Sequence, residues 1–130
     1  KFLKKHKEVE RVIYSTEHEK SIADRAKKYL QNGNGPMVGI ELKGGLEAGQ
    51  KFIEALKMFY HVANIGDARS LAIHPASTTH SQLNDEELAA SGVTQNYVRL
   101  CIGLEHIDDI IDDLDQALNK SSKTPLKAVS

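Results

Sequence analysis

Two stretches of the chain, residues 37–42 and 97–102, alternate between apolar side chains and other side chains with a period of two. The apolar positions are Val38, Ile40 and Leu42 in the first stretch and Val98, Leu100 and Ile102 in the second. Alternation of this kind predicts strands that bury one face of a sheet. A fold for this chain therefore needs a second layer that covers that face.

Amphipathic helices can supply this layer. Apolar residues recur every three or four positions in three segments, which predicts helices over about 17–30, 46–63 and 105–120. We expect the first helix to begin with a capping box at Thr16 and Glu19, and a short further helix to begin with one at Asn84 and Glu87. Short strands are also predicted over 10–14 and 70–74, and a helix end near residue 6.

Helices and strands thus interleave, with at least four short strands, and no strand is a long continuous apolar run. Strands of doubly wound parallel sheets usually are such runs, because helices cover both of their faces. We therefore predict an α+β fold, with an open, mainly antiparallel sheet of about four strands and helices packed mainly on one face.

The length and composition fit a single domain of 130 residues. With 17 basic and 18 acidic residues, the chain has no basic surface for nucleic acid or an anionic membrane. One cysteine forms no internal disulfide, and no apolar run suits a signal peptide or membrane span, so we expect a cytoplasmic location. Because the chain begins inside a charged, helical segment, we interpret residues 1–130 as a piece of a longer protein, with a frayed tail over 121–130.

Arg99 stands out within the strand predicted over 97–102. The alternation points its side chain away from the apolar layer. A guanidinium presents a planar fork of donors that fits a carboxylate or a phosphate through two parallel hydrogen bonds. Arg99 is therefore either a receptor for an anionic ligand or a partner in an ordinary ion pair with a carboxylate of the protein.

Other polar groups are better explained by structure than by chemistry. Six acidic residues between Glu105 and Asp115 fall opposite an apolar stripe, which places them in solvent and argues against a metal site. The six histidines match no zinc-binding spacing. Cys101 shares a strand face with Arg99 and is either a reactive thiol or a buried structural one. The glycines lack a nucleotide-binding fingerprint, and the serines lack the setting of a hydrolase nucleophile.

Four runs of sequence carry a resemblance to a known family: NIGDARSLAIHPASTTH at 64–80, GVT at 92–94, VRL at 98–100 and GLEHIDD at 103–109. With LKGG at 42–45 and the segment 52–63, they resemble the C-terminal domain of the Cys/Met-metabolism enzymes that depend on pyridoxal phosphate (PLP). Within this family the likeness is greatest to the O-acetylhomoserine sulfhydrylases. It covers nearly the whole chain and is weakest before Met37.

The resemblance implies a fold-type I enzyme, a tetramer, in which this chain is the small domain that closes over PLP held by a large domain. It implies that Arg99 binds the α-carboxylate of the amino-acid substrate, with Asn64 and Thr79 nearby. Asn64 favours the sulfhydrylases, because many lyases and cystathionine synthases have serine there. Sulfide or a thiol would then replace the acetate of O-acetylhomoserine, giving homocysteine or methionine. A methionine γ-lyase, a cystathionine synthase or lyase, and a non-catalytic ligand-binding module are the alternatives.

The family's cofactor-binding lysine and phosphate-binding residues belong to the large domain, and no catalytic residue is expected in this chain. Ser121-Ser122-Lys123-Thr124 is a superficial echo of the lysine motif. We therefore expect the chain alone to bind no PLP and to turn over no substrate. Titration of the isolated chain with PLP should give no saturable absorbance band of bound cofactor, and the appearance of one would refute this expectation.

Overall fold

The computed structural model describes residues 1–17 and 19–122. Its elements are, in order, α1 (Phe2–Lys5), β1 (Val9–Ile13), α2 (Lys20–Tyr29), β2 (Met37–Leu42), α3 (Gly45–Ala55), β3 (Tyr60–His61), β4 (Leu71–Ile73), the 3-10 helix η1 (Pro75–Ser77), α4 (Asp85–Ala90), β5 (Tyr97–Cys101) and α5 (Ile107–Ser121). The expected start of the tail at 121 is wrong, because Ser121 is the buried last residue of α5. Residues 123–130 of the predicted tail lie outside the described residues.

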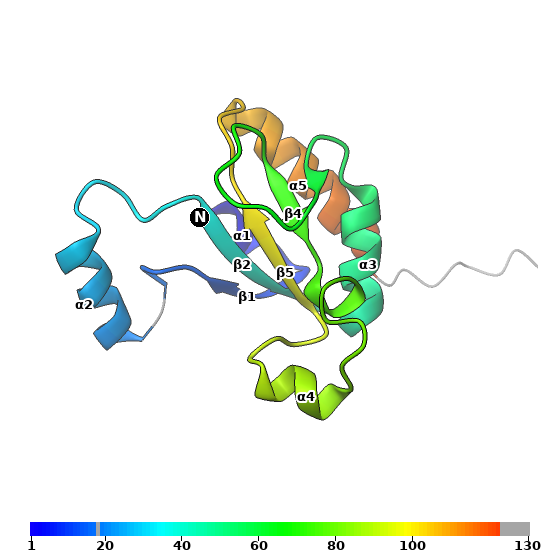
Figure 1. The fold of residues 1–130 in the computed structure, drawn as a ribbon. Coiled ribbons are helices and arrows are strands. Elements are labelled where there is room, and N and C mark those ends of the chain that lie inside the picture. Colours follow the sequence, from blue (N-terminus) through cyan, green and yellow to red (C-terminus); the bar gives the residue numbers. More distant parts are fainter. Residues whose placement is uncertain (18, 123–130) are drawn as a thin grey trace, which may run out of the picture.

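The strands form one sheet in the order β1-β2-β5-β4-β3 (Figure 1). The pairs β1–β2, β2–β5 and β4–β5 are antiparallel, whereas β3 pairs with β4 in parallel. The α+β class is confirmed. The expected mainly antiparallel sheet of about four strands needs correction, because the sheet has five strands and is mixed, with one parallel pair beside three antiparallel ones. The missed strand, β3, is only two residues long, too short to show alternation.

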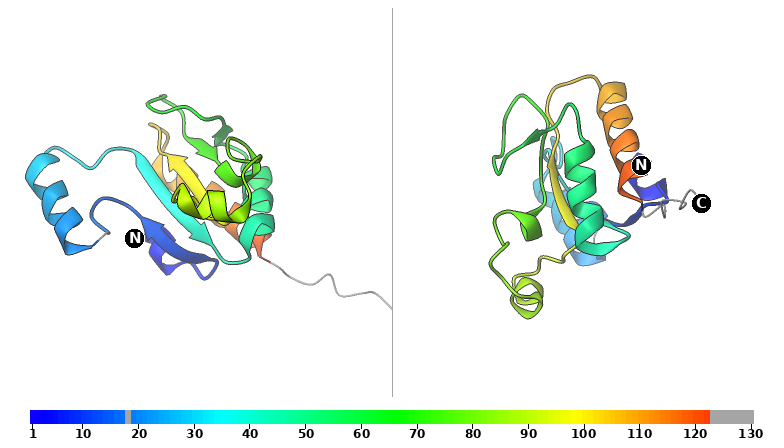
Figure 2. Two further views of the ribbon diagram at one scale, coloured as in Figure 1. Left: turned by 60° about the horizontal axis from the view of Figure 1, so that its bottom comes forward. Right: turned by 90° about the vertical axis from the view of Figure 1, so that its right-hand side faces the viewer.

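Helices α3 and α5 lie side by side on one face of the sheet (Figure 2, right). The core between the layers includes Ile40 and Leu42 of β2, Val98 and Leu100 of β5, and Phe52, Ile53, Ile110, Leu114, Ala117 and Leu118 of the two helices. The alternation therefore predicted correctly which face of β2 and β5 is buried. None of the helices in the described part of the chain has the length and apolar content needed to cross a membrane.

Helix α3 ends at Ala55, not at residue 63 as its periodicity predicted. A buried carboxylate explains this early end. Asp113 of α5 accepts hydrogen bonds from the backbone N–H groups of Lys57, at 3.0 Å, and Met58, at 2.9 Å, with a longer one from Phe59. These N–H groups therefore do not continue the helix. Asp113 also corrects the prediction that all the acidic side chains of α5 lie in solvent, because it is only 7% exposed.

The two predicted capping boxes differ in outcome. At α4 the box is confirmed, since Glu87 N donates to Asn84 Oδ1 at 3.0 Å and Asn84 N donates to Glu87 Oε2 at 2.9 Å. At α2 it is wrong, because the helix begins at Lys20 and its N-cap, Glu19, makes no side-chain cap. Helix α2 lies apart from the sheet in Figure 1 and in the left view of Figure 2, so little tertiary packing fixes where it starts.

Removing the carboxylate of Asp113 should destabilise the chain. In Asp113→Ala three backbone N–H groups lose their acceptor, and the free energy of unfolding should fall by about 3 kcal/mol, since each buried donor left unpaired costs roughly 1–3 kcal/mol. Urea unfolding followed by circular dichroism measures this. The matched control is Asp112→Ala, the exposed neighbour on α5, which should change stability by less than about 0.5 kcal/mol. Equal effects of the two substitutions would contradict the role given to Asp113.

Candidate functional site

Arg99 lies in the middle of the sheet. On β5 it pairs with Gly39 of β2 on one side and with Ile73 of β4 on the other. Because Val98 and Leu100 face the core under α3 and α5, the side chain of Arg99 lies on the opposite face, where it is half-buried. The predicted orientation of Arg99 is thus confirmed.

The surroundings of Arg99 are fixed by its neighbours. Gly39 leaves room for the ring of Tyr97, since a Cβ built on Gly39 would stand 2.6 Å from that ring. Burial raises the pKa of the Tyr97 phenol, an effect that the positive charge of Arg99 partly offsets. The neutral ring thus fills the space next to the guanidinium on this face of the sheet.

The guanidinium of Arg99 is held by a carbonyl and not by a carboxylate. Its Nη2 donates to the backbone oxygen of Asn64 at 3.3 Å. None of the ion pairs among the described side chains includes Arg99. A neutral carbonyl leaves the positive charge of Arg99 uncompensated, which is the electrostatic condition for binding an external anion.

Asn64 reaches Arg99 from the loop over residues 62–69, which connects β3 to β4 and which we call the 62–69 loop. Its side chain is exposed, and its Oδ1 accepts from the Ile65 backbone N–H at 2.9 Å. The structure therefore brings Asn64 and Arg99 together, and a role for Asn64 in substrate binding stays a prediction. The contact runs through the backbone of Asn64, so it does not depend on the asparagine side chain.

Thr79 is not joined to this pair. It follows η1, its side chain is exposed, and its hydroxyl lies 2.8 Å from Nδ1 of His80. Within the described part of the chain, no hydrogen bond or ion pair connects Thr79 with Arg99 or Asn64. A role for Thr79 in substrate binding stays a prediction.

The 62–69 loop is fixed at its end by Ser70 and Glu105. Ser70 is fully buried, and its N–H and hydroxyl donate to the two carboxylate oxygens of Glu105 at 2.6 and 2.8 Å. Burial by itself would raise the pKa of Glu105, but the hydrogen bonds, first that of the Ser70 N–H, outweigh it and hold this pKa below its usual value. Glu105 is therefore an ionised, structured carboxylate.

Sequence reasoning missed Glu105, because it was grouped with the solvated acids of the C-terminal helix. The signal that could have singled it out is its place in GLEHIDD, one of the runs that carries the family resemblance. Its partner Ser70 lies in another of those runs. The pair thus joins two of the segments that carry the family resemblance, although they are far apart in the chain.

A second arginine, Arg69, is the last residue of the loop. The guanidinium of Arg69 lies over the ring of Tyr60, 3.9 Å from its centre. Hydrogen bonds from Arg69, first from its backbone N–H and then from its side chain, lower the pKa of Asp67. The charge of Arg69 is therefore used within the loop, in contrast to that of Arg99.

The remaining sequence candidates are structural. Cys101 is 2% exposed, which favours the buried structural thiol over the reactive one. His74 is fully buried, lies 2.7 Å from the Gln95 carbonyl and 2.8 Å from the Ser77 hydroxyl, and burial lowers its pKa. A Cβ at Gly49 would come within 2.3 Å of this ring, so His74 fills a close-packed place. In the part of the chain that the structure describes, no group of three or more His, Cys, Asp or Glu residues could hold a metal ion.

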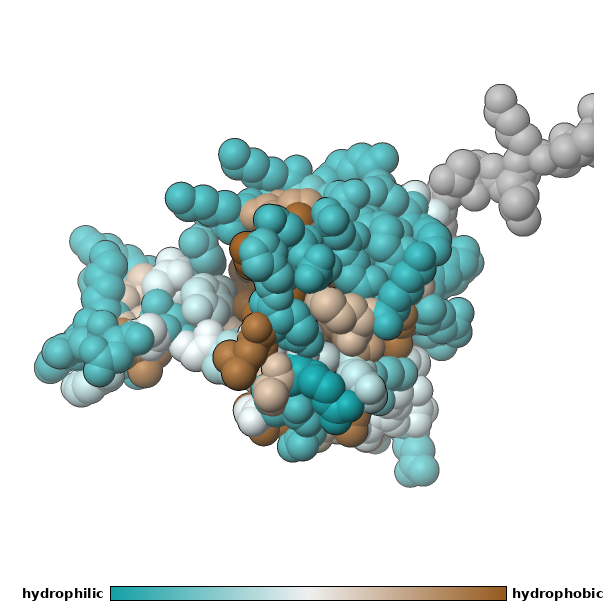
Figure 3. Space-filling model, turned by 90° about the horizontal axis from the view of Figure 1, so that it is seen from above, coloured by the Kyte–Doolittle hydropathy of each residue, from teal (hydrophilic) through white to brown (hydrophobic). Residues whose placement is uncertain are grey.

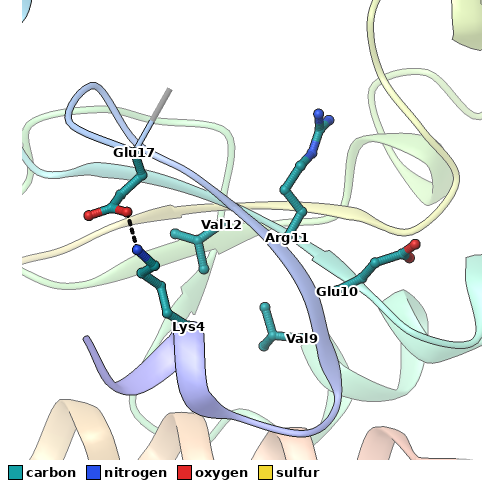
Figure 4. A pocket seen from close by; sticks show the side chains of 6 residues that line it. All are labelled: Lys4, Val9, Glu10, Arg11, Val12 and Glu17. Atoms are coloured by element: carbon teal, nitrogen blue, oxygen red, sulfur yellow. Dashed lines mark hydrogen bonds and ion pairs between the residues drawn. The ribbon is translucent and has the colours of Figure 1, made fainter. Parts of the chain in front are cut away.

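A cavity of about 260 Å³ lies beside the edge strand β1 (Figure 4), and Arg99 is not among its lining residues. Its lining includes Lys4 and Glu17, which point toward each other and form an ion pair. Arg11, also in the lining, makes a bidentate contact with Glu41 of β2, at 2.8 and 2.6 Å. Glu10, a further lining residue, accepts a hydrogen bond from the Asn96 side-chain amide at 3.3 Å. Most of the charges around the cavity are therefore engaged within the chain.

The sequence and the fold place the chain in a family. The model of the family described as Cys/Met metabolism PLP-dependent enzyme matches residues 1–119, and the chain belongs to that family. The chain is 54% identical over 119 residues to the O-acetyl-L-homoserine sulfhydrylase of Leptospira meyeri, covering 90% of this chain and 27% of that protein. It is 44% identical over 119 residues to the L-methionine gamma-lyase of Fusobacterium nucleatum subsp. polymorphum, covering 92% of this chain and 30% of that protein.

Solved structures agree. A protein assigned as O-acetylhomoserine (thiol)-lyase from Campylobacter jejuni, with pyridoxyl-lysine monophosphate, is 41% identical with a TM-score of 0.81, over 91% of this chain and 28% of that chain. Cystathionine gamma synthase from Xanthomonas oryzae pv. oryzae, in complex with cystathionine, is 32% identical with a TM-score of 0.76, over 92% of this chain and 30% of that chain. The chain thus spans less than a third of the length of these relatives.

PLP is the cofactor of the full-length enzyme, as the resemblance implied. The residues that the structure places around Arg99 do not by themselves fit this cofactor. They are Asn64 and Tyr97, with Arg69 and Asp67 farther along the loop, and they include no lysine amine to join the cofactor aldehyde. The site on this chain has the chemistry of an anion receptor.

Proposed function

We propose that this chain is the small, C-terminal domain of a fold-type I PLP enzyme and binds the α-carboxylate of the amino-acid substrate through Arg99. The observation that carries the proposal is the contact of the Arg99 guanidinium with a neutral carbonyl, that of Asn64, while no described carboxylate pairs with it. An arginine held in this way, on the face of the sheet opposite α3 and α5, has the charge and the donors that a carboxylate ligand needs.

The rigid setting of Arg99 suits this role. A bidentate contact between a guanidinium and a carboxylate fixes the orientation of the ligand as well as its position. Orientation of the reacting group contributes substantially to catalysis, because the encounter then costs less entropy in the transition state. Arg99 is on a strand with neighbours on both sides, so it can hold an amino acid in a defined orientation.

The rest of the active site would come from the large domain. The chain covers 27 to 30% of the relatives reported above, and its own Arg99 site has no lysine. Seen from above, brown apolar side chains interrupt a mainly hydrophilic surface (Figure 3). Exposed apolar side chains include Ile65 of the 62–69 loop, 57% exposed, and Leu104, 86% exposed, whose N–H donates to Ala68 of that loop. Such residues support a contact with a further part of the enzyme. On the family resemblance, we further propose that the full-length enzyme is cytoplasmic and forms a tetramer.

The proposed reaction is that of an O-acetylhomoserine sulfhydrylase, in which sulfide or a thiol replaces acetate. The 54% identity with a sulfhydrylase and the asparagine at position 64 support it. A methionine γ-lyase is the second candidate, supported by the 44% identity reported above.

The full-length enzyme should consume sulfide in the presence of O-acetylhomoserine, as measured by loss of sulfide and formation of homocysteine. Release of a thiol from methionine, without consumption of sulfide, would favour the lyase.

Arg99 variants of the full-length enzyme test the carboxylate site. Arg99→Ala should raise the KM for the amino-acid substrate roughly 10- to 100-fold, since a hydrogen bond to a charged group contributes about 1.5–3 kcal/mol. Arg99→Lys keeps the charge but loses the fork, and should give an intermediate KM. The KM for sulfide should stay near that of the unchanged enzyme. A KM for the amino acid that neither substitution alters would show that Arg99 has a structural role instead.

A further inference from the structure

Ser70 is the end point of the 62–69 loop and uses each of its polar atoms. Its carbonyl accepts from the Tyr60 N–H at 2.9 Å, which closes the base of the loop. Its N–H and its hydroxyl donate to Glu105, and its hydroxyl oxygen accepts from the Gly103 N–H at 2.9 Å. Ser70 is fully buried and Glu105 half-buried, so water has access to these contacts only from the side of Glu105.

Glu105 and Gly103 belong to the segment that directly continues β5, the strand that carries Arg99. In this segment the Leu104 N–H also donates to the Ala68 carbonyl at 2.8 Å. The two backbones approach so closely that a Cβ on Gly103 would stand 2.5 Å from the Ala68 oxygen. The continuation of β5 is therefore tied to the end of the loop, while Arg99 on β5 contacts Asn64 near the start of the same loop.

The carboxylate of Glu105 directs its charge to Ser70 and not to Arg99. Both of its oxygens accept from Ser70, and no ion pair among the described side chains joins it to an arginine. An acid so placed can order the loop without neutralising the anion receptor. An acid paired with Arg99 would instead compete with an incoming carboxylate.

We propose that Glu105 is a positioning residue for the substrate-carboxylate site. Through Ser70 it fixes the 62–69 loop, so that the Asn64 carbonyl holds one arm of the Arg99 guanidinium and leaves the fork oriented toward the substrate. This inference rests on the proposed function of Arg99. Glu105 itself does not contact the substrate.

The test is a double-mutant cycle in the full-length enzyme with PLP bound. Glu105→Ala should raise the KM for the amino-acid substrate about 10-fold, because a misplaced binding group loses that order of affinity. The KM for sulfide, the absorbance of bound PLP and kcat should change less than about twofold. In the Arg99→Ala background, Glu105→Ala should add little, since residues that act through one another are not additive.

A merely structural role gives a different pattern. It would lower the thermal midpoint and the fraction of active enzyme, and its effect would multiply with that of Arg99→Ala. Glu105→Gln keeps the shape of the side chain, so it tests the role of Glu105 even where Glu105→Ala fails to fold. It should give a smaller rise in KM, about threefold, because Ser70 keeps one acceptor. Ser70→Ala, which removes the hydroxyl and leaves the carboxylate in place, should also raise this KM.

The control is Asp112→Ala, which removes the same charge from an exposed position on α5 and should leave every constant unchanged. Unchanged KM in both Glu105 variants, with a raised KM in Arg99→Ala, would overturn this inference and leave the proposed function standing. An unchanged KM in Arg99→Ala would instead overturn the proposed function. Multiplicative effects of the two substitutions would also overturn the positioning role.

Discussion

The register of β5 against its two neighbours is the constraint on which the rest of the structure depends. Val98 pairs with Ile40, and Arg99 pairs with Gly39 on one side and Ile73 on the other. Because successive side chains on a strand point to opposite faces, a slip of one residue would bury Arg99 under α3 and α5 and expose Val98. The same pairing that builds the hydrophobic core therefore keeps a charged guanidinium on the opposite face.

Two buried or half-buried carboxylates then organise the connections around this sheet. Asp113 collects the backbone N–H groups that follow α3, and Glu105 collects the N–H and hydroxyl of Ser70. In each case the negative charge is compensated by hydrogen-bond donors without a cation. Neither acid therefore competes for Arg99, whose charge is left for a ligand.

The parts of the fold set by local pattern were predictable from the sequence. Strand β2 matches its predicted bounds, β5 and α5 match theirs to within a residue or two, and the cap of α4 was found from the spacing of Asn84 and Glu87. The failures have different causes: β3 is too short to show alternation, little packing fixes the start of α2, and the end of α3 depends on a tertiary contact. Phe59 continues the helical stripe in the sequence, but in the structure it is buried and lies in a bent segment after α3, where Asp113 accepts from its N–H. No periodicity could reveal that contact, because its two ends lie on different elements.

The candidate site was likewise predictable from the sequence only in part. The sequence identified Arg99 and its orientation by alternation, and the resemblance brought Asn64 to it, but the contact through the Asn64 backbone carbonyl could not be read from side-chain types. Glu105 was counted with the solvent-facing acids of the C-terminal helix, but the helix begins only at Ile107. Helical periodicity therefore gives no information about where the side chain of Glu105 lies. Its partner Ser70 lies at the end of a loop, where only the folded arrangement brings the two together.

The order of the strands also affects how the chain is made. The central strand β5 is the last of the five to leave the ribosome, although β2 and β4 both pair with it. Until it emerges, the inner edges of β2 and β4 carry unpaired backbone groups, and the apolar face of β2 lacks its full cover. Assembly of the sheet thus depends on closing long loops late, which slows folding and lengthens the period in which a nascent chain needs protection from aggregation.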